Sequence, residues 1–185
     1  MRRVAVIGSS GSGKTTFARR LAARLGVPHV ELDALHWTEG GWAEPPLEEF
    51  RARVGAAVGE TEWVIDGGYY GKLGTLVWRH ADTIVWLDVA LPVALWRITR
   101  RAIPRIVARE TLWNANRETF RNVFLARDGL FRYAARTHRG RRERLERRLA
   151  DPSVAHVTVH RFRSSAEAER WLRSVPNVSE KTPRA

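Results

Sequence analysis

A glycine-rich run near the N-terminus carries the clearest chemical signal in the chain. Residues Gly8-Ser-Ser-Gly-Ser-Gly13-Lys14-Thr15 match the pattern G-x-x-x-x-G-K-[ST], between an apolar run and a helical pattern. Glycines let the backbone curl so that successive N–H groups bind phosphate oxygens, and the helix N-terminus adds its dipole. The lysine of this pattern reaches the β- and γ-phosphates, and the hydroxyl beside it ligates Mg²⁺. The sequence therefore predicts a site for a nucleoside triphosphate, with ATP and Mg²⁺ as cofactors, made by Gly8, Ser9, Ser10, Gly11, Ser12, Gly13, Lys14, Thr15 and Thr16.

Three aspartates come directly after predicted strands. Because the carboxyl ends of parallel strands form the ligand-binding edge of an open sheet, we expect Asp33, Asp66 and Asp88 near the glycine-rich run. One of them should hold Mg²⁺ through water, and the metal candidates are Thr15, Asp66 and Asp88. Each aspartate could instead cap a helix or lie in a loop. That alternative is strongest for Asp88, which precedes a helix expected to open at Pro92.

Alternating apolar runs and helical patterns predict the elements that position these side chains, and they indicate βα units around a parallel sheet. Strands are expected at residues 4–7, 29–32, 63–65, 83–87 and 154–159. Helices are expected at residues 14–25, 47–58 and 92–103, and after a capping box formed by Ser164 and Glu167. Pro104 should interrupt or kink the helix that precedes it. Tryptophans 63, 86, 96 and 171 are expected in the core, whereas tryptophans 37, 42 and 113 fall in predicted loops or polar surroundings, where they more often mark a site.

Composition limits the class of protein. The chain has 185 residues, 44% of them hydrophobic, and no cysteine, which excludes a disordered chain, a disulfide scaffold and a cysteine nucleophile. The N-terminal apolar run is too short for a signal peptide and no stretch is apolar enough to span a bilayer, so a cytoplasmic location is expected. We expect a single domain over residues 1–174, followed by a flexible tail at 175–185.

Positive charge is concentrated in one segment. The chain carries a formal net charge of +12, and residues 97–148 hold sixteen arginines against five acidic residues. Residues 105–150 show a helical pattern with little strand signal. Such a segment needs an anionic partner or a solvated surface. Nucleic acid is one candidate partner, with the aromatic residues 113, 120, 124, 131 and 133 available to stack on bases, although their spacing fits the core face of a helix better.

Taken together, the glycine-rich run, the strand-end aspartates, the arginine-rich segment, and the last strand and helix resemble the small P-loop kinases of the adenylate-kinase and shikimate-kinase type. The resemblance covers nearly the whole chain. It implies an α/β, three-layer P-loop kinase fold with a five-stranded parallel sheet and a helical, arginine-rich lid insertion. In that arrangement residues 105–150 are the lid and residues 34–62 belong to the acceptor side.

Three shorter segments are similar to a narrower bacterial group, often described as topology-modulation proteins or adenylate-kinase-like ATPases. They span residues 31–37, 66–69 and 110–118. Membership of this group implies a P-loop kinase fold and specifies no acceptor.

The acceptor side departs from adenylate kinases, which have Phe-Pro-Arg after the Asp-Gly pair, where this chain has Gly68-Tyr69-Tyr70. An aspartate after the second strand is more similar to shikimate kinases, where it faces the acceptor and can take up a hydroxyl proton. The acceptor site implied by the resemblance consists of Asp33, His36, Trp37, Gly67, Gly68, Tyr69 and Lys72. His36 could equally be a surface histidine packed on a tryptophan.

Phosphoryl transfer also needs cations on the migrating group, and arginine supplies them bidentately. The catalytic residues expected are therefore Lys14, Asp33 and a lid arginine, with Arg117 the first candidate and Arg101 the second. Two functions follow. The first is an ATP- and Mg²⁺-dependent phosphotransferase acting on a small-molecule or nucleotide acceptor, which we favour. The second is a P-loop ATPase that binds nucleic acid through its arginine-rich segment.

Overall fold

Five parallel strands form the central sheet. The structure is a computed structural model that describes residues 1–37, 43–111, 119–126 and 129–178. The strands lie in the order β2-β3-β1-β4-β5 and all neighbours are parallel. They are β1 (Arg3–Gly8), β2 (His29–Glu31), β3 (Trp63–Asp66), β4 (Thr83–Leu87) and β5 (Thr158–Phe162). The predicted five-stranded parallel sheet is therefore confirmed, with β1 in its centre because its apolar run is buried on both faces.

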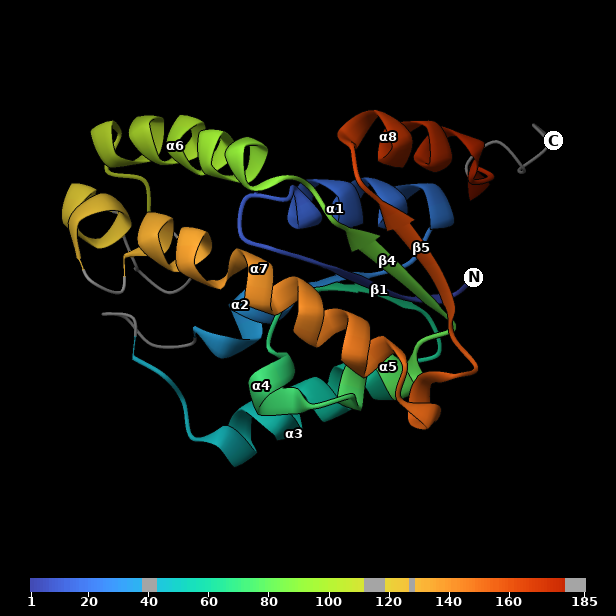
Figure 1. Ribbon diagram of the computed structural model, residues 1–185. Helices are drawn as coiled ribbons and strands as arrows, with labels where there is room; N and C mark the ends of the chain where they lie inside the picture. Colours follow the sequence, from blue (N-terminus) through green and yellow to red (C-terminus); the bar gives the residue numbers. More distant parts are fainter. Residues whose placement is uncertain (38–42, 112–118, 127–128, 179–185) are drawn as a thin grey trace, which may run out of the picture.

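Helices cover both faces of the sheet, which makes the fold three-layered (Figure 1). One face carries α1 (Lys14–Leu25) and α8 (Ser165–Ser174), which pack on Val4 and Val6. The other face carries α3 (Leu47–Gly59), α5 (Leu76–His80) and α7 (Leu130–Leu149), which pack around Ala5 and Ile7. The capping box that opens α8 is confirmed, because Ser164 Oγ accepts a hydrogen bond from Glu167 N–H at 3.2 Å and Glu167 accepts one in return from the backbone of Arg163.

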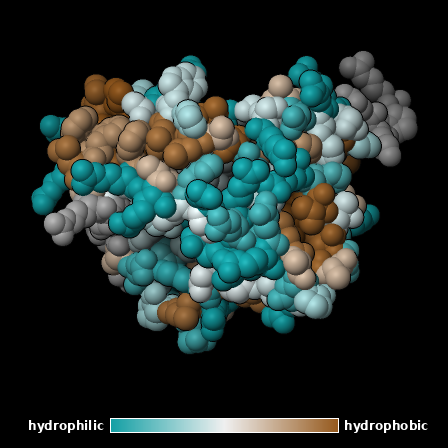
Figure 2. Space-filling model, in the orientation of Figure 1, coloured by the Kyte–Doolittle hydropathy of each residue, from teal (hydrophilic) through white to brown (hydrophobic). Residues whose placement is uncertain are grey.

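The arginine-rich segment is built from α6 (Leu91–Val107), a π-helical turn (Arg121–Leu125) and α7. Ile98 and Ala102 of α6 pack with Val123 of the turn and Ala134 of α7. Hydrophilic side chains gather over α7 at the centre of the view in Figure 2, and apolar ones gather over the far end of α6. Among the helices that the structure describes, none is both long and apolar enough to cross a membrane.

Two predicted strands differ from the observed ones. The second strand ends at Glu31 rather than at residue 32, and Asp33 lies on the short helix α2 (Leu32–His36). The last strand was expected at 154–159 but spans Thr158–Phe162. Val154 and Val157 gave the apolar signal because they are buried in the core, yet they belong to a 3-10 turn (Pro152–Val154) and the residues after it.

Two expectations about α6 are wrong. Pro104 does not interrupt this helix, which was expected to end at residue 103 but continues to Val107, and the Pro104 carbonyl still accepts a hydrogen bond from Ala108 N–H at 2.9 Å. Trp96 is not in the core, since 59% of its surface is exposed and the guanidinium of Arg100 lies 5.2 Å from the ring centre. The buried stripe of α6 runs on the opposite side, through Ala94, Ile98 and Ala102.

Candidate functional site

Glycine geometry shapes the loop between β1 and α1. Gly11 has a φ of 76°, and a Cβ atom there would lie 2.3 Å from the carbonyl oxygen of Ala94 at the start of α6. Gly13, with a φ of 92°, immediately precedes the first turn of α1. Only glycine adopts these positions without strain, so the loop curls around the free N–H groups of the α1 N-terminus. That geometry suits a phosphate group.

Lys14 is the cation at the centre of this loop. Its Nζ atom donates a hydrogen bond to the carbonyl oxygen of Ser9 at 3.0 Å. Burial lowers the pKa of Lys14 below its usual value of 10.5. The carboxylates of Asp66 and Asp33 act to raise this pKa, and Asp66 has the larger effect. The guanidinium groups of Arg141 and Arg101 act to lower it, and Arg141 has the larger effect. The structure therefore brings charges from four separate elements within electrostatic reach of one ammonium group.

Asp66 is buried at the carboxyl end of β3, beside the loop. Its Oδ1 atom accepts a hydrogen bond from Thr15 Oγ1 at 3.1 Å, and its Oδ2 atom lies 2.8 Å from His29 Nε2. A hydroxyl and a carboxylate are the oxygen ligands that Mg²⁺ prefers beside substrate phosphates, so Thr15 and Asp66 fit this ion. Within the described residues, no three His, Asp or Glu side chains are grouped closely enough to hold a metal ion by themselves.

Asp33 and Tyr69 are joined across the acceptor side. Tyr69 Oη donates a hydrogen bond to Asp33 Oδ1 at 2.7 Å. Tyr69 directly precedes α4 (Tyr70–Leu73), and Asp33 lies on α2, so this bond connects the two helices. Burial, followed by the negative charge of Asp33, raises the pKa of Tyr69, so its hydroxyl keeps its proton and remains a donor. The carboxylate of Asp33 is thereby fixed in position by one of its two oxygens.

His36 is a buried residue, which excludes the surface alternative. Only 1% of it is exposed, and its Nε2 atom lies 2.8 Å from Lys72 Nζ, which also forms a 2.8 Å ion pair with Glu44. Because an ammonium group can only donate, Nε2 accepts and the imidazole proton is on Nδ1. Burial, then the charge of Lys72, lowers the pKa of His36, so the ring is neutral. Its ring contacts, all with centroids within 5 Å, are Trp37, Phe50 and Tyr69.

Two glycines connect β3 to α4 and bring the acceptor side close to the sheet edge. A Cβ atom on Gly67 would lie 2.5 Å from Leu32 Cβ, so the turn passes directly against α2. A Cβ atom on Gly68 would lie 3.6 Å from both Arg141 Nη1 and Tyr70 Oη. The strand-end turn therefore faces α7, which lies in the segment predicted to be a lid. The short helices α4 and α5 after this turn were not predicted, because each is only a few residues long.

Asp88 ends β4 but does not cap α6, whose N-cap residue is Ala90. Arg161 donates two hydrogen bonds to Asp88 Oδ2, from Nε at 2.9 Å and from Nη2 at 2.6 Å. Arg142 Nη2 lies 3.1 Å from the same oxygen. These contacts tie β4 to β5 and to α7. A role for Asp88 as a metal ligand stays a prediction.

The arginines considered for the predicted lid differ in what the structure describes of them. Arg117, like Trp42 and Trp113, lies outside the described residues. Arg101 and Arg141 are the arginines whose charges lower the pKa of Lys14. Arg141, which our sequence analysis missed, donates a hydrogen bond to Tyr133 Oη at 2.9 Å.

A periodic signal could have found Arg141. Ala134 and Leu145 are buried on α7, and His138, four residues after Ala134, donates to the carbonyl oxygen of Val89 at 3.0 Å. Arg141 follows at the next position of this 4-3-4 spacing, so it lies on the face of α7 that turns toward the sheet.

Comparisons with known proteins support the fold and leave the activity open. No family model matches the chain. The ATP-dependent protease ATPase subunit HslU of Campylobacter jejuni is 40% identical over 47 residues, which is 25% of this chain and 11% of that protein. The chain therefore matches only a small part of the length of its curated relatives.

Solved structures match over nearly the full chain. A shikimate kinase from Acinetobacter baumannii, in complex with shikimate, superposes with a TM-score of 0.56 at 18% identity and covers 99% of this chain and 96% of its own. A shikimate kinase from Bacteroides thetaiotaomicron gives a TM-score of 0.51 at 18% identity, over 93% of this chain and 94% of its own. The chain has the P-loop kinase fold that the sequence motifs predicted.

Proposed function

We propose that the protein is an ATP- and Mg²⁺-dependent phosphotransferase that moves the γ-phosphoryl group of ATP to a hydroxyl group of a small acceptor. The observation that carries this proposal is the group of charges around Lys14, where a phosphate-binding loop, two carboxylates and two guanidinium groups meet at the sheet edge. The fold shared with shikimate kinases supports the same class of reaction. The resemblance to the topology-modulation group rests on its motifs and agrees with it.

On the nucleotide side, the loop backbone and the α1 N-terminus bind the phosphates, while Lys14 exchanges its bond to the Ser9 carbonyl for the β- and γ-phosphate oxygens. Thr15 and Asp66 would hold Mg²⁺, and His29 fixes the orientation of the Asp66 carboxylate. When bound, Mg²⁺ neutralises charge on the β- and γ-phosphate oxygens.

On the acceptor side, Asp33 receives the proton of the attacking hydroxyl group. Tyr69 holds the Asp33 carboxylate in place. The Tyr69 ring stacks on the His36 ring with centroids 4.5 Å apart, and Lys72 donates a hydrogen bond to His36. The acceptor would lie against Gly67, Gly68 and Trp37, beside this pair. In this step the Asp33 carboxylate acts as the general base.

On the lid side, Arg101 and Arg141 would place guanidinium groups on the migrating phosphoryl group and exclude water from it. Both lie close enough to Lys14 to act on its pKa without any movement of the helices. Arg117 remains a proposed further member of this group.

The decisive experiment is a screen for acceptor-dependent ADP formation across nucleosides and nucleotides, sugars and hydroxy acids. Product phosphorylation is verified by ³¹P NMR, and Lys14→Ala serves as the control for contaminating kinases. Acceptor-dependent turnover that Lys14→Ala abolishes supports the proposal. Failure of every acceptor class, together with salt-resistant binding of duplex DNA, would favour the nucleic-acid alternative instead.

A further inference from the structure

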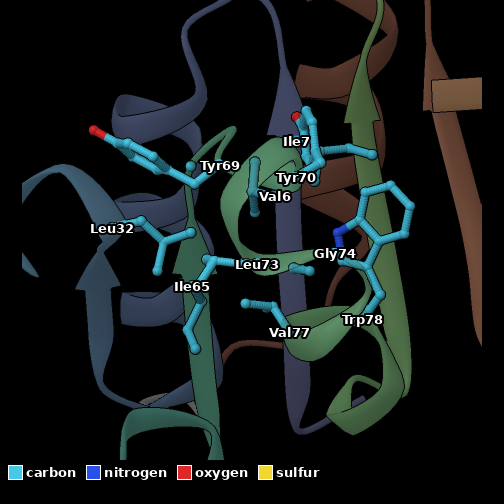
Figure 3. A pocket seen from close by; sticks show the side chains of 12 residues that line it. Val6, Ile7, Leu32, Ile65, Tyr69, Tyr70, Leu73, Gly74, Val77 and Trp78 are labelled. Carbon is cyan, nitrogen blue, oxygen red and sulfur yellow. The ribbon is translucent and has the colours of Figure 1, made fainter. Parts of the chain in front are cut away.

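Tyr70 points away from its neighbour Tyr69 and toward the nucleotide side. Figure 3 shows the Tyr69 ring on the same side as Leu32 with its hydroxyl directed outward, while the Tyr70 ring lies beside Ile7 above a small cavity. The Tyr70 ring packs on Trp78 with centroids 5.3 Å apart, and its backbone carbonyl accepts a hydrogen bond from Arg148 of α7. The first contact holds the ring and the second holds the backbone that carries it, so the position of the hydroxyl group is set by the fold.

The Tyr70 hydroxyl is shielded from solvent and has no hydrogen-bond partner among the residues that the structure describes. The groups near it include the backbone of Gly8, the turn at Gly68 and the guanidinium of Arg141, and the charges of Arg148 and Tyr133 also act on it. The Gly8 N–H is close enough to act on the pKa of Tyr70 but makes no hydrogen bond of normal geometry. A backbone N–H and a guanidinium group can only donate, so neither provides an acceptor for the hydroxyl proton.

An unpartnered buried hydroxyl destabilises a fold unless something else requires it. Burial raises the pKa of Tyr70 to about 12, with Arg141 acting in the opposite direction, so the hydroxyl remains protonated at neutral pH. Its surroundings are the first residue of the phosphate-binding loop, the strand-end turn and a lid arginine. A proton donor among such groups is complementary to an anionic oxygen.

We propose that the Tyr70 hydroxyl is a catalytic residue that donates a hydrogen bond to an oxygen of the phosphoryl group during its transfer. The inference rests on the proposed function and extends it. In the reaction, the bond between the γ-phosphorus and its bridging oxygen breaks, the acceptor oxygen forms the new bond, and the acceptor proton passes to Asp33. Tyr70 keeps its own proton throughout and stabilises negative charge on a non-bridging oxygen.

The test uses Tyr70→Phe, which removes the hydroxyl and keeps the ring that packs on Trp78. Three quantities are measured: the melting temperature, the affinity for Mg²⁺-ATP and for Mg²⁺-ADP with aluminium fluoride, and turnover. We expect an unchanged or raised melting temperature, ATP affinity within about threefold of wild type, and affinity for the aluminium fluoride complex and turnover each reduced roughly 100-fold. The fluoride complex mimics the phosphoryl group in transfer, so this arm needs no known acceptor.

Thr83→Val is the matched control, because it removes a buried hydroxyl that has a partner, Asp82 Oδ1 at 2.7 Å, at the opposite end of the sheet. This control should lower the melting temperature and leave ligand affinity unchanged. A lowered melting temperature in Tyr70→Phe with normal affinity for the fluoride complex would overturn the inference, since the hydroxyl would then serve the fold. So would a variant that matches wild type in all three quantities. If wild type itself binds no Mg²⁺-ATP, the proposed function fails first.

Discussion

The nucleotide side and the acceptor side of this sheet edge are built in different ways. The nucleotide side consists of a short contiguous loop, one cation and a strand-end carboxylate, held by backbone geometry at Gly11 and Gly13. The acceptor side consists of side chains from α2, α4 and α7, held by hydrogen bonds and ring contacts between residues far apart in the sequence. The proposed phosphate site is therefore encoded locally, whereas the proposed acceptor site depends on how distant elements pack.

The largest expected effect is on the nucleotide side. Lys14→Ala should reduce turnover roughly 1000-fold and weaken Mg²⁺-ATP binding, because the variant lacks the cation that contacts the β- and γ-phosphates. Isothermal titration calorimetry and the acceptor assay measure the two effects. Arg19→Ala, which removes an exposed cation from the same helix, is the control and should change neither. Unchanged ATP affinity in Lys14→Ala would refute the phosphate-binding role.

Paired substitutions of two aspartates separate the two sides. Asp33→Asn should reduce transfer to the acceptor roughly 100-fold and spare ATP affinity, since a carboxamide cannot take up the hydroxyl proton. Asp66→Asn should instead raise the Mg²⁺ concentration needed for half-maximal ATP binding, because it replaces a candidate metal ligand. Metal titrations of binding and of turnover distinguish them. If Asp33→Asn shifts the Mg²⁺ requirement, Asp33 belongs to the metal site.

The sequence predicted correctly that the glycine-rich loop and Asp66 lie together at the sheet edge, and the reason is physical. A phosphate-binding loop needs glycine and lysine at fixed spacing, and strand ends in a parallel sheet must share one edge, so Lys14 and Asp66 follow from local pattern and topology. Trp96 was misplaced because a large apolar side chain within a helix need not lie on its buried stripe, which in α6 runs through Ala94, Ile98 and Ala102. The position of Tyr70 depends on how α4 packs against the sheet, which no local spacing specifies. The spacing along α7 indicates which face carries Arg141, but it does not show that this face lies near Lys14.

On the lid side, Arg141→Ala should reduce turnover roughly 10- to 100-fold and change ATP affinity less, because its charge is needed most while the phosphoryl group is in transfer. Arg139→Ala is the matched control on the same helix. Its side chain is 95% exposed and contacts only Glu143 among the ion pairs of the described residues, so no effect is expected. Equal losses in the two variants would indicate a general effect of lid charge and would contradict a specific role for Arg141.

Asp88 tests whether α7 is held against the sheet independently of ligand. Asp88→Asn weakens ion pairs to Arg142 and Arg161, whose side chains are partly exposed, so we expect a loss of about 1–2 kcal/mol in the free energy of unfolding. Hydrogen exchange in α7 should become faster in this variant and slow again when Mg²⁺-ATP is added. Unaltered exchange in α7 would show that the apolar contacts of Leu145 hold the helix by themselves.

The smallest expected effect concerns the pH dependence of the acceptor side. His36 has a pKa below its usual 6.5 because it is buried and next to Lys72, so the unfolded chain binds more protons than the folded protein as the pH falls below 6.5. Stability should therefore be fully present above that pH and decrease below it.

The pKa of His36, followed by NMR, should rise in Lys72→Met, because this variant removes the second cause of the shift. His160, whose pKa is lowered by burial alone, is the internal control and should titrate unchanged. A pKa of His36 at or above 6.5 in the wild-type protein would contradict this prediction. It would mean that the Nδ1 proton has a hydrogen-bond acceptor in solution and that the packing of His36 on Tyr69 does not persist.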